Sequence, residues 1–178
     1  MNPEILFTEK QRFTQWWLWL ILIAINSLLL FGVFKQVIGG GQFGDKPMNN
    51  VTLLITTALI SLLSLLFLTF RLDTIVKKDG IYVRFSPFHL KFKHYGWESL
   101  TKSYVRQYSA IGEYGGWGLR FGLFGKGRAF NVSGDKGLQL QFNDGKKLLI
   151  GTNKPIELTE TLSKIDQLKQ DDIPINTH

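Results

Sequence analysis

Cysteine is absent from this chain of 178 residues, which excludes a disulfide framework and a thiolate metal site. Histidine is scarce, and only His89 and His94 lie close to one another in the sequence. Five residues apart, they would face opposite sides of a single strand. No His-Glu-x-x-His pattern accompanies them. The sequence therefore predicts no metal site.

A nucleotide-binding loop is also missing, although residues 112–137 hold nine glycines in 26 residues. A phosphate loop ending at Gly125-Lys126 needs a glycine where Arg120 stands and a Ser or Thr where Gly127 stands. The Gly-x-Gly-x-x-Gly pattern between a strand and a helix is absent too. We expect no cofactor and no catalytic residue.

Two interpretations of this glycine-rich segment stay open. The glycines are typical of tight turns and bulges in a curved sheet. They also let a partner or ligand approach the backbone closely. In the second case the candidate interaction surface consists of the aromatic and basic side chains among the glycines: Trp117, Arg120, Phe121, Lys126 and Arg128.

Charge is missing from two strongly apolar stretches, 16–34 and 51–70, which are 19 and 20 residues long. At a rise of about 1.5 Å per residue, such helices span the roughly 30 Å hydrocarbon core of a bilayer. We expect a transmembrane hairpin over 16–70, with spans of about 16–38 and 51–70. No Ala-x-Ala-like site follows the first stretch, so a retained helix is favoured over a signal peptide.

The segment before the first span, 1–15, is expected to lie at the membrane interface. Thr8 and Gln11 form a capping box, which predicts that the first helix begins before it enters the lipid. Aromatic side chains at headgroup level would follow, namely Phe13, Trp16, Trp17 and Trp19.

Polar residues occupy the middle of both spans. Asn26 lies mid-way along the first span, and Ser61 and Ser64 share one face of the second. An interhelix contact among them is worth roughly 0.6 to 2 kcal/mol. Contacts in a homo-oligomer or a polar step in a transport path are alternatives. The absence of charge from both spans argues against an ion relay.

Lysine and arginine beside the spans predict the orientation of the hairpin. The connection 35–50, which is glycine-rich and expected to be flexible, holds two such cations, whereas 71–91 holds five. Because cytoplasmic flanks are richer in Lys and Arg, we expect a cytoplasmic C-terminal domain. With an even number of spans the N-terminus lies on the same side.

Residues 71–169 change to the two-residue period of strands. Asp79-Gly80 and Asp144-Gly145 are typical of tight hairpin turns. Strands are expected over 72–76, 81–85, 90–94, 102–108, 138–142 and 147–150, with a short irregular or single-turn element at 97–100. An amphipathic helix begins at Pro155, with its apolar stripe at Leu158, Leu162, Ile165 and Leu168. The tail 170–178 is expected to be disordered.

Several different short motifs follow one another along this domain, at 113–120, 131–134, 137–140, 144–146, 149–152 and Pro155. They begin with Glu-Tyr-Gly-Gly-Trp-Gly-Leu-Arg and continue with Asn-Val-Ser-Gly. In these motifs the chain resembles a group of small bacterial membrane proteins with a PH-like domain. The resemblance implies an α+β protein of the bacterial inner membrane, in which a seven-stranded PH-like antiparallel barrel with a C-terminal helix follows the transmembrane hairpin.

Positive charge dominates residues 71–154, with 15 Lys or Arg against 6 Asp or Glu. Each cation near an anionic leaflet gains roughly 1 kcal/mol. The candidate membrane-facing cations are Arg71, Lys77, Lys78 and Arg84. The tight Asp79-Gly80 turn leaves little loop to hold an inositide headgroup. Membrane-side cations account for the pI near 9.6, so we expect no nucleic-acid partner.

The sequence thus favours a non-enzymatic, membrane-anchored PH-like module. Its expected partners are the lipid bilayer and a membrane or cytoplasmic protein, and a homo-oligomer is a further possibility. The alternative is a subunit of a membrane enzyme or transporter complex whose site forms on assembly.

Overall fold

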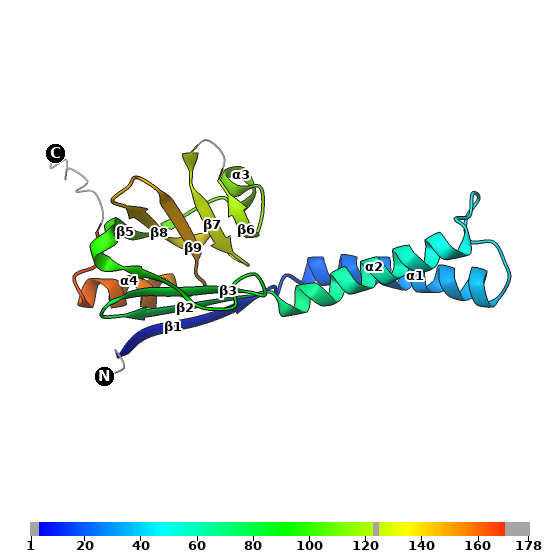
Figure 1. The fold of residues 1–178 in the computed structure, drawn as a ribbon, viewed down its shortest axis with the longest axis horizontal. Helices are drawn as coiled ribbons and strands as arrows, with labels where there is room; N and C mark the ends of the chain where they lie inside the picture. The colour runs from blue at the N-terminus through cyan, green and yellow to red at the C-terminus, as the bar shows by residue number, and fades with distance from the viewer. Residues whose placement is uncertain (1–3, 123–124, 170–178) are drawn as a thin grey trace. The chain divides into compact units, whose positions relative to one another are not determined.

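The computed structural model describes residues 4–122 and 125–169, and its two compact units interleave in the sequence (Figure 1). One unit is the helical segment Thr14–Thr69. The other unit joins the N-terminal Met1–Phe13 to Phe70–His178. The helical hairpin is therefore an insertion into the β-rich domain, and the domain does not simply follow it.

The N-terminal segment is a strand, β1 (Ile5–Arg12), and the prediction of an interfacial helix start there is wrong. It pairs antiparallel with β2 (Arg71–Lys77), with Arg12 opposite Arg71. Alternate residues of β1 are buried, as a strand with one covered face requires. The capping-box pattern at Thr8 and Gln11 is local. The conformation of this segment is instead decided by its pairing with β2, which follows both helices in the sequence.

Strand β1 begins a four-stranded sheet, sheet A, in the order β1-β2-β3-β4. Strand β3 (Gly80–Ser86) follows a tight turn at Lys78-Asp79, one residue earlier than the predicted Asp79-Gly80, and Lys77 pairs with Gly80 across it. Strand β4 (Lys93–Gly96) begins three residues later than predicted, because residues 87–92 form a loop. A short 3-10 turn at Trp97–Ser99 matches the single-turn form of the element expected there and ends this half of the domain.

The second sheet, sheet B, has the order β5-β8-β9-β7-β6. Its members in chain order are β5 (Leu100–Gln107), β6 (Gly118–Phe121), β7 (Arg128–Asn131), β8 (Lys136–Phe142) and β9 (Lys147–Gly151). The short helix α3 (Ala110–Tyr114) lies between β5 and β6. All strand pairs are antiparallel except β7 with β9, which is parallel.

The fold is α+β, as predicted, but the described residues do not close into a barrel of about seven strands as the PH-like resemblance implied. The described residues form nine strands in two separate sheets, which Figure 1 shows as two layers. Three of these strands lie outside those expected from the sequence pattern. Strand β1 is supplied from before the helices, and the glycine-rich segment forms both β6 and β7 where turns were expected.

Helix α4 (Pro155–Lys164) begins at the predicted proline and contacts β1, β5 and β8, so it touches both sheets. Leu158 and Leu162 are buried, whereas Leu168 is exposed. The predicted stripe stops early because the helix ends before Asp166, which has a positive φ of 53°. Lys169 then forms an isolated antiparallel bridge with Ser103 on the edge strand β5. The predicted disordered tail, 170–178, lies outside the described residues.

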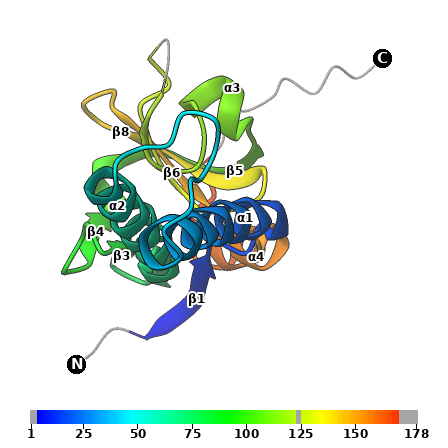
Figure 2. The ribbon, with the colours of Figure 1, turned by 90° about the vertical axis from the view of Figure 1, so that its right-hand side faces the viewer.

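The helical unit consists of α1 (Trp16–Val33), a π-helical turn at Phe34–Ile38, and α2 (Asn50–Thr69). Figure 2 shows α1 and α2 side by side. The continuous helices Trp16–Ile38 and Asn50–Thr69, of 23 and 20 residues, are long and apolar enough to cross a membrane. Gln36 organises their connection, because its side-chain amide donates to the Met48 carbonyl at 2.6 Å and to Asn50 Oδ1 at 2.8 Å.

Two polar side chains fasten β1 to the second sheet. Glu9 is 6% exposed, and its carboxylate accepts hydrogen bonds from Thr152 Oγ1 at 2.6 Å and from the Asn153 backbone N–H at 2.8 Å. Gln11 is also buried and donates to the Gly151 carbonyl at 2.6 Å. The N-terminal strand is thus tied to the end of β9 as well as to β2.

We predict that Glu9→Ala destabilises the β-domain by about 2 kcal/mol, because the buried Thr152 hydroxyl and the Asn153 N–H lose their acceptor. Urea unfolding of the full chain in detergent, followed by tryptophan fluorescence, measures the effect. Glu4→Ala is the control, since Glu4 forms an exposed ion pair with Lys78 and its loss should change stability by less than about 1 kcal/mol. Equal midpoints for the two variants would contradict the role assigned to Glu9.

Candidate functional site

The glycine-rich segment folds into α3 and the β6–β7 hairpin, and two of its glycines are required by the backbone. Gly115 ends α3 in the left-handed conformation with φ of 68°. Gly127 has φ of 83°, and a Cβ there would lie 2.2 Å from the Lys147 carbonyl oxygen. These positions match the interpretation of the glycines as turn residues.

The structure splits the five side chains of the candidate interaction surface into two groups. Trp117 is partly buried against the cluster that includes Tyr108 and Tyr114. Arg120 Nε donates to the Trp117 carbonyl within the same turn, and Lys126 lies 3.8 Å from Glu113. Phe121 and Arg128 line a common pocket, whose described lining does not include the other three side chains.

This pocket, here named the Arg128 pocket, has a volume of about 590 Å³. It lies where β4 of sheet A meets sheet B, so it depends on the whole domain rather than on one loop. Aromatic and basic side chains dominate its lining, namely Tyr95, Phe121, Arg128, Phe142, Lys146 and Lys147. The rings of Tyr95 and Phe142 are in contact, with centroids 5.4 Å apart.

The charge in the Arg128 pocket is mainly positive. Its one carboxylate, Asp144, is paired with Lys146 at 2.6 Å, and the hydrogen bond from Lys146 lowers the pKa of Asp144. The Arg128 guanidinium lies 5.2 Å from the centroid of the Phe121 ring. Within the part of the chain that the structure describes, neither Arg128 nor Lys147 forms an ion pair. Two exposed cations therefore line the pocket without an ion pair to any described carboxylate.

Tyr95 contributes a neutral hydroxyl to the same pocket. Burial raises the pKa of Tyr95, and the nearby Arg128 cation opposes this rise in part. The phenol therefore stays protonated at neutral pH and can donate a hydrogen bond. With aromatic surface, two unpaired cations and this donor, the pocket suits a ligand that combines an anionic group with an apolar one.

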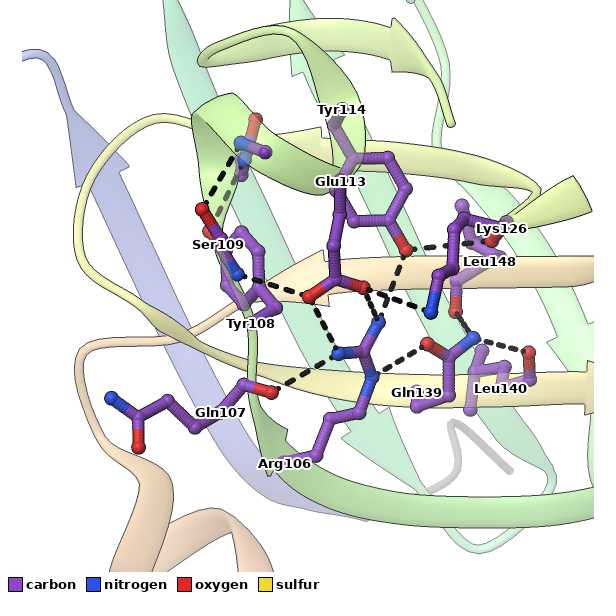
Figure 3. Close-up of polar contacts among 12 residues, drawn as sticks. Arg106, Gln107, Tyr108, Ser109, Glu113, Tyr114, Lys126, Gln139, Leu140 and Leu148 are labelled. Atoms are coloured by element: carbon purple, nitrogen blue, oxygen red, sulfur yellow. Dashed lines mark hydrogen bonds and ion pairs between the residues drawn. The ribbon is translucent and has the colours of Figure 1, made fainter. Parts of the chain in front are cut away.

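A second polar cluster, centred on Arg106 of β5, holds α3 against sheet B (Figure 3). Arg106 Nη1 and Nη2 donate to the two carboxylate oxygens of Glu113 at 3.1 and 2.8 Å. Its Nε donates to Gln139 Oε1 at 3.0 Å, and Nη2 also reaches the Tyr114 hydroxyl at 3.3 Å. Glu113 accepts a further bond from the Ser109 backbone N–H. Because the donors of Arg106 are occupied, this cluster is structural.

Glu113 gives this cluster a pH dependence. The hydrogen bonds from Arg106 are the main cause that holds the pKa of Glu113 below its ordinary value of 4.5. The folded state thus favours the ionised carboxylate. The resulting stabilisation is fully present above pH 4.5 and is lost as the pH falls through the lower pKa of the folded state.

We predict that Glu113→Gln lowers the stability of the domain by about 2 kcal/mol at neutral pH, because a charge-assisted bidentate contact is lost. The difference from the wild type should shrink in strong acid, at a pH well below 4.5, where Glu113 itself becomes protonated. Urea unfolding at the two pH values tests this. Glu160→Gln, on the exposed face of α4, should leave both midpoints nearly unchanged. A difference that persists undiminished in acid would refute the ionic role of Glu113.

The four predicted membrane-facing cations do not form one patch. Arg71 and Arg84 both bind Asp73, which is buried, at 2.9 and 2.7 Å. Lys77 and Lys78 lie at the other end of β2, six or seven residues further on, which corresponds to roughly 20 Å of strand. The first pair therefore neutralises a buried carboxylate, and the second pair belongs to the far end of sheet A.

The predicted interhelix residues do come together. Asn26 Nδ2 donates to Ser64 Oγ at 2.8 Å, and Ser61 Oγ donates to Asn26 Oδ1 at 2.9 Å. Asn26 Nδ2 also donates to the Leu22 carbonyl at 2.7 Å. The amide oxygen and nitrogen of Asn26 are thus both satisfied between two apolar helices, where an unpaired amide would be costly.

We predict that Asn26→Leu weakens the association of the two helices by about 0.6 to 2 kcal/mol, because the bonds to Ser61 and Ser64 are lost. Unfolding of the full chain in mixed micelles with a rising fraction of dodecyl sulfate measures this difference. Ser27→Leu is the matched control, since it introduces the same side chain at an exposed neighbouring position. If both variants unfold alike, the polar contact does not stabilise the hairpin.

No protein-family model, curated protein or solved structure matches this chain. Among the described residues, no group of three or more His, Asp or Glu side chains is arranged to hold a metal ion. His89 Nδ1 instead accepts the Phe85 backbone N–H at 3.2 Å, and His94 stacks on the Tyr82 ring.

Proposed function

We propose that this chain is a membrane-anchored binding protein without catalysis of its own, whose β-domain holds an acidic segment of a partner protein in the Arg128 pocket. The observation that carries the proposal is the pairing of aromatic walls with two cations that have no carboxylate partner in the described domain. A carboxylate beside an apolar side chain satisfies both features at once. Such charge complementarity also accelerates association.

Anchoring in a membrane is supported by the two apolar helices and by the place of β1. A cleaved signal peptide would carry β1 away with it, and the domain would lose the buried side chains of Phe7, Glu9 and Gln11. A retained hairpin keeps them. Because β1 and β2 are paired, both ends of the hairpin belong to one domain, which requires an even number of crossings.

We extend the proposal to topology and ancestry. The excess of Lys and Arg after the second helix favours a cytoplasmic domain, with both termini on that side of a bacterial inner membrane. A PH-like relationship is supported by the order of a four-stranded sheet, a second sheet and a C-terminal helix. The parallel pairing of β7 with β9 and the added strands would then be elaborations of this plan.

We predict that a photoreactive benzoylphenylalanine at Phe121 crosslinks a defined polypeptide when the full-length protein is irradiated in its native membrane. Phe121 is 75% exposed on the rim of the pocket, so the substitution leaves the core intact. The adduct should be lost in the Arg128→Gln/Lys147→Gln background and should weaken as salt rises. Electrophoresis and mass spectrometry of the purified adduct give the readout.

Two controls make this experiment specific. Lys102→Gln/Lys164→Gln removes the same charge away from the pocket and should leave the adduct unchanged. The same photoreactive residue at Ile156, which is also 75% exposed, should give no such adduct. Lipid adducts alone would refute a protein partner, and copurification of a membrane enzyme or transporter would identify the chain as a subunit of that complex.

A further inference from the structure

The loop between β3 and β4, residues 87–92, lies at the end of sheet A from which the helices leave; it is here named the Phe88 loop. Arg12, Arg71 and Ser86 are cross-strand neighbours in β1, β2 and β3. The chain enters α1 shortly after Arg12 and leaves α2 just before Arg71. The loop that follows Ser86 therefore starts in the same row of the sheet as both helix connections.

Aromatic contacts link this loop to the residue that covalently follows α2. The Phe70 ring lies 5.6 Å from the Phe88 ring, 6.3 Å from Phe85 and 5.8 Å from Phe13, by centroid distance. Phe85 is fully buried, whereas Phe88 is 59% exposed. The cluster thus runs from the core of the domain to its surface beside the helix connection.

The apolar tip of the loop faces outward. Leu90 is 88% exposed, which is more than any other large apolar side chain in the described part of the chain. His89 between the two apolar residues is turned inward, because its backbone N–H donates to the Phe85 carbonyl and its ring accepts from the Phe85 N–H. The exposed cation Lys91 follows directly. This spacing presents two apolar side chains together, next to positive charge.

Such a composition is typical of segments that enter the interface of an anionic membrane. In the anchoring proposed above, the membrane surface lies next to the loop. Helix α2 has 20 residues and therefore spans about 30 Å, the thickness of the hydrocarbon core, which places Phe70 at the interface. Phe88 is in ring contact with Phe70, so the loop is already held beside the lipid and its insertion is an intramolecular step.

We propose that the Phe88 loop inserts Phe88 and Leu90 into the interfacial layer of the membrane that holds the hairpin. This inference rests on the membrane anchoring proposed above and adds a third point of attachment to the two helix connections. Three points restrict the tilt of the domain against the bilayer more than two adjacent connections can. They would thereby limit the directions in which the Arg128 pocket can face.

Single-cysteine labelling tests this directly, because the chain has no cysteine of its own. The full-length protein would carry an environment-sensitive nitrobenzoxadiazole dye at Leu90→Cys, Leu28→Cys or Ile5→Cys, in vesicles of phosphatidylcholine and phosphatidylglycerol. Leu28 lies within α1 and reports on the hairpin. Ile5 is 56% exposed and pairs with Lys77, at the end of sheet A that is farther from the Phe88 loop.

The expected result is a shift of the Leu90 emission to shorter wavelength, quenching by nitroxide-bearing lipid, and loss of quenching by aqueous iodide relative to Ile5. A Leu90 dye that is as accessible to iodide as the Ile5 dye, with a shielded Leu28 dye, would overturn the insertion of the loop while leaving membrane anchoring intact. An accessible Leu28 dye would overturn both proposals.

A second measurement excludes an effect of the dye on insertion. The dye is moved to Lys91→Cys, first with the native loop and then with Phe88→Ser/Leu90→Ser. Both of these side chains are exposed, so the domain should fold in either case. The Lys91 dye should be shielded from iodide with the native loop and become accessible in the double variant. Equal accessibility in both would contradict insertion driven by Phe88 and Leu90.

Discussion

The pairing of β1 with β2 is the constraint on which the rest of this structure depends. The two strands are neighbours in sheet A, yet the entire helical hairpin separates them in the sequence. The ladder can close only if the hairpin returns the chain to its starting point. The contact of Asn26 with Ser61 and Ser64, and the ring contact of Phe13 with Phe70, both serve this return. Closing so long a segment through two packed helices avoids the entropy loss of closing a flexible loop of the same length.

The charged groups of the domain separate into those that hold the fold and those that face outward. Glu9, Asp73 and Glu113 each have specific partners, as a buried or half-buried carboxylate requires. Arg128 and Lys147 line a pocket instead and pair with no carboxylate in the described part of the domain. Phe88 and Leu90 are apolar residues that likewise face outward, since both are exposed although the core beside them is well packed. These exceptions carry the functional proposals, because packing and hydrogen bonding within the chain do not explain them.

Much of the fold could be predicted from local sequence patterns. The tight turn beside Asp79, the turn at Asp144-Gly145, the helix start at Pro155 and the two apolar helices each depend on residues adjacent in sequence. The wrong predictions have one cause in common: each concerns residues whose position depends on segments far away in the sequence. Leu90 belongs to an alternating pattern that predicts a strand, but it lies on an exposed loop. The five candidates of the glycine-rich segment looked like one surface, yet the described pocket is lined by Phe121 and Arg128 and not by the other three, and its aromatic partners come from β4 and β8.

From the sequence alone, the number and length of the apolar helices, the α+β class and the local hairpins were already determined, because each depends on spacing within a few turns of chain. Only the tertiary structure decided that the first residues form a strand, that two sheets replace a barrel, and that Arg106 clamps Glu113. These features depend on which distant segments lie side by side. That choice is made by the burial of whole sheet faces and the satisfaction of buried polar groups, and no local pattern contains it.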